Sequence, residues 1–145
     1  MSLERFSRRI ATRADSIQRN VDKTVRRVAL AADQAVVLGT PVDTGRARSN
    51  WRVSLGSPVF DTVEPFAPGA RLGLGEQANA QGAIAQGAAV IGARRDGQDI
   101  WISNNVPYIG ALNDGSSDQA PANFVEAAIA QAVAVVRNAR VVDGN

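Results

Sequence analysis

Apolar residues recur every three or four positions along the start of the chain, which keeps them on one stripe of an α-helix. Ser2 is a suitable N-cap, and Gly39 ends the helix because Thr40 precedes Pro41 and is biased away from the α region. The pattern predicts one helix over residues 3–39, about 54 Å long at 1.5 Å per residue. The stripe consists of Leu3, Phe6, Ile10, Ala14, Ile17, Val21, Val25, Val28, Ala32 and Ala35.

A helix of this length is longer than a domain of this size can cover alone. We therefore expect part of the stripe to meet another subunit. The alternative is a helix folded back on its own domain, with its arginines on a solvated face.

Two short segments alternate apolar and polar residues, the pattern of strands with one buried face. Trp51, Val53 and Leu55 share one side of the first segment, and Ile100 and Ile102 share one side of the second. The two segments predict a small antiparallel sheet.

The segment between these strands predicts a loop and a helix. Residues 56–75 are rich in proline and glycine, as in loops, and could hold a short strand at residues 59–63. Residues 76–93 are rich in alanine, which favours helix, although each glycine in it costs roughly 1 kcal/mol. So many small residues let another backbone approach closely, so we expect this helix to be packed. Asp96-Gly97 then turns the chain into the second strand.

Turn-forming residues follow the second strand. Asn104 and Asn105 can hydrogen-bond nearby backbone, and Pro107 prevents the strand from continuing. Residues 108–114 predict two turns of helix, closed at Gly115. The side chains expected to point inward are Tyr108, Ala111 and Leu112.

The last predicted helix begins at Asn123, a suitable N-cap with Glu126 three residues later, as in a capping box. It is expected to end near Arg140. Its predicted apolar side consists of Phe124, Val125, Ile129, Val133 and Val136.

Together these elements predict the fold class α+β: a long N-terminal helix, a small antiparallel sheet, an Ala/Gly-rich middle helix and a C-terminal helix packed on the sheet. With 145 residues, 45% of them apolar, the chain suits a single domain, residues 1–145, divided into a basic amphipathic helix over 1–39 and a body over 40–145. Trp51 and Trp101 are expected to be at least partly buried against the last helix, because large aromatics dominate burial in a small domain.

Charge is distributed unequally along the chain. Residues 1–30 hold eight basic and three acidic groups, a net +5, and the remainder holds eight basic and eleven acidic groups, a net −3. Such asymmetry favours contact with a complementary surface. All basic residues except Lys23 are arginines, which favour ion pairs at interfaces and phosphate contacts.

The sequence holds no histidine and no cysteine, so the usual nucleophile-base pairs, disulfides and sulfur-ligated zinc are excluded. The acid pairs Asp61/Glu64 and Asp96/Asp99 lie in predicted loops, as turn formers and solvated charges. We expect no enzyme activity, no catalytic residue, no cofactor and no metal. No stretch approaches the roughly 18 apolar residues of a membrane span, and the start lacks an apolar signal region, so folding in a cytoplasm is expected.

Two segments resemble a known family. TPVDTGRARSNW and ISNNVPYIGALNDGSSDQAPANFVEAAI are similar to the neck proteins of long-tailed bacteriophages, the tail-completion or head-tail joining group. Members typically carry a VDTG-R-L-R-x-S-type segment, a strand leading to Asn-x-x-Pro-Tyr, an x-L-E-x-G turn and a proline-containing loop before the last helix. This chain departs from the pattern at Ala47, where leucine is common, and at Asn113-Asp114, where glutamate usually follows the leucine. The matching residues are Val42, Asp43, Thr44, Gly45, Arg46, Arg48, Asn104, Asn105, Pro107, Tyr108, Leu112, Gly115 and Pro121.

The resemblance implies a structural virion protein, not an enzyme, that forms a homo-oligomeric ring or collar in the neck and is made in the host cytoplasm. The implied partners are portal or connector proteins on the head side and tail terminator or tail tube proteins on the tail side. Non-specific contact with packaged DNA is a further option. A purely structural role in one subunit is the alternative for Pro107, Tyr108 and Gly115. The expected interface residues are Arg8, Arg9, Arg13, Arg46, Arg48, Asn104, Asn105, Pro107 and Tyr108.

A basic DNA-binding structural protein is the alternative function. Eight basic groups on one helix could neutralise several phosphates. However, the arginines are distributed around the helix and only Phe6 interleaves with them, so base stacking or readout is not expected. A salt-dependent complex of the isolated protein with duplex DNA would favour this alternative.

Overall fold

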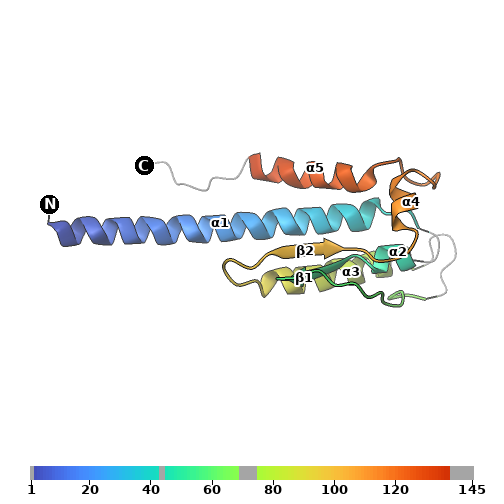
Figure 1. Ribbon diagram of the computed structural model, residues 1–145, viewed down its shortest axis with the longest axis horizontal. Helices are drawn as coiled ribbons and strands as arrows, with labels where there is room; N and C mark the ends of the chain where they lie inside the picture. Colours follow the sequence, from blue (N-terminus) through green and yellow to red (C-terminus); the bar gives the residue numbers. More distant parts are fainter. Residues whose placement is uncertain (1, 43–44, 69–74, 138–145) are drawn as a thin grey trace.

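The computed structural model describes residues 2–42, 45–68 and 75–137 of the chain. One long helix runs the length of the molecule, and the other elements gather around its C-terminal half (Figure 1). The predicted fold class, α+β, is confirmed. In chain order the elements are α1 (Leu3–Gly39), α2 (Arg46–Ser49), β1 (Arg52–Leu55), α3 (Glu76–Gly92), β2 (Ile100–Ser103), α4 (Ile109–Asn113) and α5 (Phe124–Arg137).

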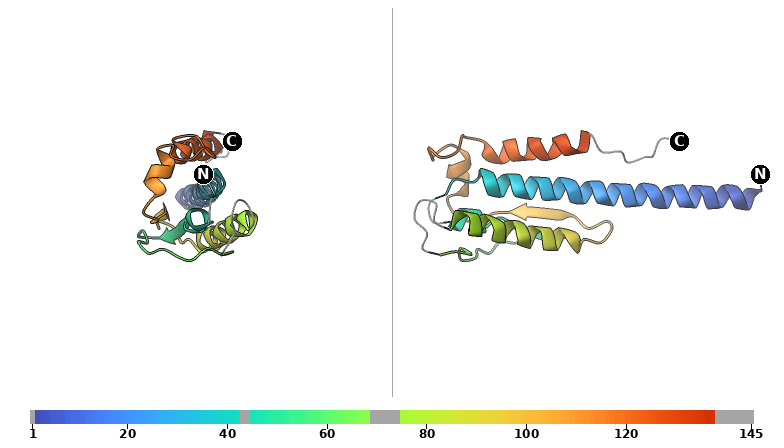
Figure 2. Two further views of the ribbon diagram at one scale, coloured as in Figure 1. Left: turned by 90° about the vertical axis from the view of Figure 1, so that its right-hand side faces the viewer. Right: turned by 180° about the vertical axis from the view of Figure 1, so that it is seen from behind.

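The long helix α1 is the middle layer of the body. Seen end-on in Figure 2, α5 lies on one side of α1, and the sheet and α3 lie on the other. The sequence predicts the last helix on the sheet, whereas α5 packs on α1. The physical reason is that the apolar stripe of α1 and the apolar side of α5 bury each other, while α3 covers β1.

The ends of α1 lie where the sequence predicts them. Ser2 Oγ accepts a hydrogen bond from the Arg5 backbone N–H at 3.3 Å, which satisfies a free donor of the first turn. At the other end Thr40 is the C-cap, and its hydroxyl donates to Val36 O at 2.6 Å.

The two strands form an antiparallel sheet in which Val53 pairs with Ile102. Val53 is buried in a cluster with Ala29 of α1 and Ile91 of α3. Trp51, just before β1, is buried in a second cluster that includes Phe124 of α5, as predicted. Trp101 is 42% exposed, so its predicted burial is wrong. Its side chain lies on the face of the two-stranded sheet that no described helix covers.

Side-chain amides take the place of further strands beside β1. Gln86 of α3 accepts from Val53 N at 3.2 Å and donates to Val53 O at 3.1 Å. Residues 59–63 form a loop, not the short strand considered from the sequence. Asn50 accepts from Val63 N at 2.7 Å and donates to Val63 O at 2.8 Å, which satisfies the backbone there without strand pairing.

The glycines of α3 allow the close packing that its composition predicts. A Cβ at Gly82 would lie 2.6 Å from Cγ of Phe66. A Cβ at Gly87 would overlap the Asp33 carboxyl and lie 2.9 Å from Cγ2 of Val53. Glycine at position 87 therefore lets α3 approach both α1 and β1.

The amide of Asn113 caps α5 from the end of α4. Asn113 Oδ1 accepts from Val125 N at 3.0 Å, and its Nδ2 donates to both carboxylate oxygens of Glu126 at 3.1 and 2.9 Å. Asn123, the predicted N-cap, has φ 64° in the left-handed region. An N-cap side chain normally reaches the first turn from an extended backbone. Because Asn123 has a left-handed backbone instead, Asn113 accepts the hydrogen bond from the first turn of α5.

The inward side of α5 is rotated from the predicted one. Phe124, Ala128 and Ala132 are buried, whereas Ile129 is 52% and Val133 is 46% exposed. Alanines fill the inward positions because they allow α5 to lie close to α1. This leaves two large apolar side chains in contact with solvent.

Some predictions fall outside the described residues. These are the motif positions Asp43 and Thr44, the side chain of Val136 and the helix end near Arg140. The first segment is described at residues 40–42 and again from Gly45, which has φ 76° and directly precedes α2.

Candidate functional site

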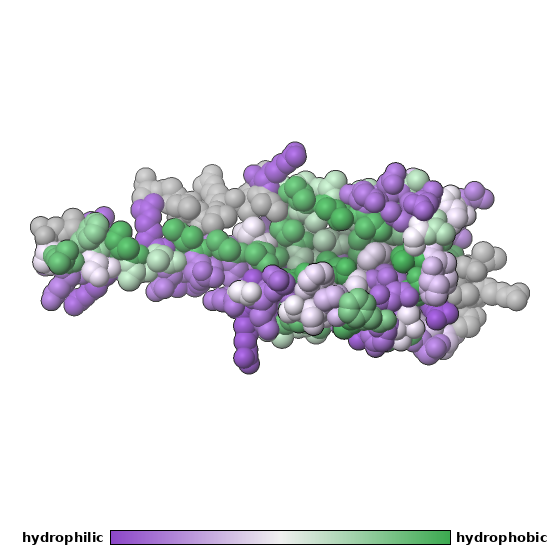
Figure 3. Space-filling view, viewed as in Figure 1, coloured by the Kyte–Doolittle hydropathy of each residue, from purple (hydrophilic) through white to green (hydrophobic). Residues whose placement is uncertain are grey.

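The N-terminal part of α1, residues 2–15, is here called the arm. Every arm residue is exposed, and Leu3 is 82%, Phe6 53% and Ile10 54% exposed. Figure 3 shows the apolar stripe running along the protruding part of α1 and into the seam between α1 and α5. Within the described residues, α5 covers only the C-terminal part of this stripe. The arm therefore presents a helix-packing surface to its surroundings.

The covered part of the stripe shows how a helix packs on it. A Cβ at Gly39 would lie 3.6 Å from the Phe124 ring, an ordinary van der Waals distance, so the ring of Phe124 packs against the end of α1. Ala35 of the stripe is partly buried and packs against the cluster that includes Phe124 and Ala128 of α5. The uncovered part has the same spacing of apolar residues and is suited to a similar helical partner.

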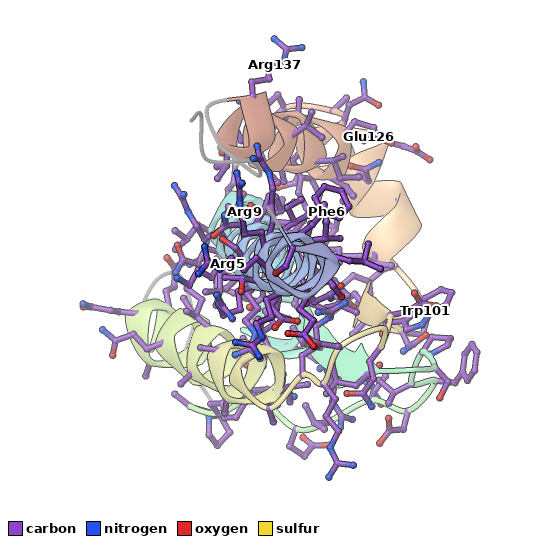
Figure 4. The ribbon with its side chains drawn as sticks, turned by 90° about the vertical axis from the view of Figure 1, so that its left-hand side faces the viewer. Arg5, Phe6, Arg9, Trp101, Glu126 and Arg137 are labelled. Atoms are coloured by element: carbon purple, nitrogen blue, oxygen red, sulfur yellow. The ribbon has the colours of Figure 1, made fainter. Side chains whose placement is uncertain are left out.

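Basic side chains lie on the other sides of the arm. In Figure 4, Phe6 projects from one side of α1, and Arg5 and Arg9 project from the other side. The predicted interface residues Arg8, Arg9 and Arg13 are all exposed on the arm. The arm thus combines an apolar stripe with a basic surface.

The charges at the junction of arm and body already have partners within the subunit. Asp22 contacts Arg26 at 3.0 Å and Arg94 at 2.7 Å. Arg26 also donates to Gly92 O at 3.2 Å and to Arg94 O at 2.8 Å, at the C-terminal end of α3. These contacts fix the direction in which α1 leaves the body.

A second candidate surface lies at the opposite end of the molecule. A groove of about 460 Å³ opens between the segment after α1, α2 and α4. It brings together Arg46 and Tyr108, two of the predicted interface residues. Gln119 accepts from Val42 N at 2.9 Å and holds the loop before α5 against this groove. The lining residues are Pro41, Val42, Gly45, Arg46, Ala47, Tyr108, Leu112, Ser117 and Gln119.

Tyr108 points outward, in contrast to the inward orientation predicted for it. The helix α4 begins at Ile109, and Ile109 and Leu112 pack against the core. Tyr108 precedes the first helical residue and is 38% exposed, and Ala111 and Pro107 are also exposed. A half-open tyrosine beside a groove is suited to protein contacts, because its ring can be buried while its hydroxyl finds a partner.

Asn104 joins the two sequence motifs within one subunit, and Asn105 joins the second motif to the loop after β1. Asn104 Nδ2 donates to Ala47 O at 2.7 Å, and its Oδ1 accepts from Val106 N at 3.2 Å. Asn105 Nδ2 donates to Val59 O at 2.8 Å. The amide of Asn104 therefore positions Ala47, which lines the groove, and contact of either asparagine with a neighbour stays a prediction.

Arg48 closes the C-terminal end of α1. Its guanidinium donates to Leu38 O at 3.2 Å and to Thr40 O at 3.0 Å, and it lies 3.8 Å from the Glu76 carboxylate. Burial lowers the pKa of Arg48, and Glu76 opposes that shift. The last turn of α1 has no basic residue of its own, so Arg48 supplies the positive charge that favours a helix C-terminus.

Asp33 is an unusual titratable group in the core. It is 1% exposed, neither carboxyl oxygen has a hydrogen-bond partner, and burial raises its pKa to about 7. A group this deeply buried is closed to a substrate. Among the described residues no three acidic side chains are grouped to hold a metal ion, and none of the described helices is long and apolar enough to cross a membrane.

No family model, curated protein or solved structure matches this chain.

Proposed function

We propose that this chain is a structural virion protein of a tailed bacteriophage that forms a ring or collar in the neck and joins the DNA-filled head to the tail. The observation that carries the proposal is the arm, which exposes an apolar stripe over about four helical turns. A contiguous exposed apolar surface marks an interaction site, because it is costly to leave in water.

The position of the sequence motifs supports the proposal. The segments around residues 45–48 and 104–108 are far apart in the chain, yet Asn104 bonds to Ala47 and Arg46 shares a groove with Tyr108. The residues that resemble the neck family thus gather at one end of the molecule, and the arm projects from the other end. A ring subunit in a stack needs separate contacts of this kind, beside, above and below itself.

In the proposed neck, copies of this chain contact one another within the ring. Portal or connector proteins lie on the head side, and tail terminator or tail tube proteins on the tail side. The chain itself catalyses no reaction and needs no cofactor in this role.

A basic DNA-binding protein is the second candidate, favoured by the exposed arginines of the arm. Clustered arginines bind phosphates, and such binding weakens strongly as salt increases. A salt-dependent shift of duplex DNA by the isolated protein, together with undisturbed head-tail joining when the arm is altered, would favour this candidate.

The neck proposal is tested by reversing the charge of two arm residues, Arg8→Glu with Arg13→Glu. Both side chains are exposed, so the variant should unfold with nearly unchanged stability, within about 0.5 kcal/mol. Complementary charge steers association, so joining should fall at least tenfold. The measurement mixes heads and tails from lysates that lack this protein with added wild-type or variant protein and counts infectious particles.

The matched control reverses two exposed arginines that lie at the body, Arg27→Glu with Arg95→Glu. This control should join heads to tails as the wild type does. Wild-type protein that leaves heads and tails separate would exclude the neck function. If the arm variant joins heads to tails as well as the wild type does, the arm has no part in the neck function.

A further inference from the structure

We propose that the arm of one copy packs its apolar stripe on the outer face of α5 in a second copy, a contact repeated from copy to copy. The inference rests on the proposed function, since it supplies the side-to-side contact of the ring. The arm stripe is Leu3, Phe6, Ile10 and Ala14, and the outer face of α5 is Ile129 and Val133.

The arm stripe continues a surface that α5 already covers within one subunit. The C-terminal part of α1 packs on α5 of the same chain, whereas every residue of the arm is exposed. The arm spans fourteen residues, and α5 spans the same number, so both helices are about 21 Å long. The α5 helix of a second copy therefore matches the arm stripe in length, and it is the same helix that covers the rest of α1 within one subunit.

The helix α5 has an apolar face left over after it has packed on α1. Phe124, Ala128 and Ala132 face α1 and are buried. Ile129 and Val133 lie one turn apart on another side of α5, and about half of each side chain is exposed. A helix that is apolar on two sides is typical of one that packs between two neighbours.

Opposite charges border the two surfaces. The arm holds four arginines against Glu4 and Asp15, a net +2. The arm projects away from its own body, so Arg13 approaches Glu126 of a second copy when that copy docks (Figure 1). Arg13 borders the arm stripe three residues after Ile10, and Glu126 borders the outer face three residues before Ile129. Figure 4 shows Phe6 and Glu126 on the same side of the molecule.

The same charges disfavour a symmetric pair of antiparallel arms. In a two-fold pair each edge of the helix faces the same edge of its partner, so Arg13 would lie beside the Arg13 edge of the second arm. Like charges that lie side by side in this way oppose association. An arm on α5 is a contact between two different surfaces, and such a contact generates a ring when its rotation closes.

The test uses two single variants of the full chain, Phe6→Asp on the arm and Ile129→Asp on α5. Each places a charge at a half-exposed position of one surface and leaves the other surface intact. We expect the wild type to self-associate and each variant alone to associate at least tenfold more weakly. An equimolar mixture should give a 1:1 dimer that neither variant gives alone, because one intact arm and one intact α5 remain. Light scattering after gel filtration measures the masses.

Phe60→Asp is the matched control, because Phe60 is an 82% exposed aromatic in a loop outside both surfaces. It should associate as the wild type does, and thermal unfolding should show that all three variants are folded. If Ile129→Asp alone unfolds at a lower temperature, Val133→Ser provides a milder change at the same face.

Three results would overturn the inference: a monomeric wild type at high concentration, wild-type association of Ile129→Asp, or a mixture that stays monomeric. These results are distinct from a failure of the neck function. If the chain self-associates but cannot join heads to tails, the neck function is excluded and the arm contact is retained. If a monomeric chain joins heads to tails, the arm contact is excluded and the neck function is retained.

Discussion

At the scale of single residues, Asp33 shows how packing and electrostatics oppose each other in this core. Its carboxyl group lies on α1 against Gly87 of α3 and near Val53 of β1. No hydrogen bond replaces the water that it loses, so burial favours the protonated form. No periodicity marks position 33 as special, because an aspartate on a helix is usually solvated.

The raised pKa of Asp33 predicts a stability that falls as pH increases. Below the ordinary value of 3.8 the group is protonated in both states, and between that value and about 7 only the unfolded chain loses its proton. The cost of burial therefore grows up to pH 7 and then stays near 4 kcal/mol, from about three pKa units at 1.36 kcal/mol each.

Asp33→Asn should remove this part of the pH dependence, because the amide is neutral at every pH. The measurement is the free energy of unfolding in denaturant at pH 5 and pH 8. Asp15→Asn, on an exposed position of the same helix, is the control and should keep the wild-type slope. A slope that survives in Asp33→Asn would assign the pH dependence to other groups.

Tyr108→Ala separates a docking residue from a core residue. Because Tyr108 is 38% exposed, its truncation should cost about 1 kcal/mol of stability, less than the roughly 3 kcal/mol or more of a fully buried aromatic. Joining of heads to tails should be lost at a temperature where the variant is folded. Tyr108→Phe isolates the hydroxyl, and a large drop in melting temperature with normal joining would contradict the docking role.

At the scale of elements, the position of α3 depends on its glycines. Gly87→Ala should destabilise the protein by about 1–3 kcal/mol, because the new Cβ overlaps Asp33 and crowds Val53. In Gly92→Ala, at the end of the same helix, the new Cβ would meet no other atom within 4 Å. This variant should therefore be up to about 1 kcal/mol more stable, because alanine favours helix over glycine. Thermal unfolding of the two variants compares packing with propensity, and equal effects would mean that packing at Gly87 does not limit the fold.

At the same scale, one side chain at the end of α4 fixes the start of α5. Asn113 joins them by bonding to Val125 N and to the Glu126 carboxylate. Local sequence rules assign the capping of α5 to Asn123, but in the structure the Asn113 side chain makes these contacts.

At the scale of the whole molecule, the chain divides into a protruding basic arm and a packed body. The Asp22, Arg26 and Arg94 contacts hold the middle of α1 on the body. Beyond them α1 continues as an exposed helix. A rigid projection with an apolar stripe can reach a neighbour without first paying the entropy of folding, which favours assembly from preformed subunits.

The sequence alone determined the features that depend on near neighbours in the chain. The stripe, the Ser2 cap and the end at Gly39 predicted α1, and Asp96-Gly97 predicted the turn into β2. Helix periodicity and capping act within a turn or two, so one sequence window contains all the residues involved. The absence of histidine and cysteine also limited the chemistry at this level.

Only the tertiary structure decided which faces are covered. Trp101 and Ile129 belong to correctly predicted elements, yet both are exposed, because burial depends on which distant element packs on each face. The sequence predicted α5 on the sheet, whereas α1 occupies the space between them. The physical reason is that an apolar stripe in the sequence shows only that a helix must pack on something. Which element packs on it depends on how all the apolar faces fit together in three dimensions.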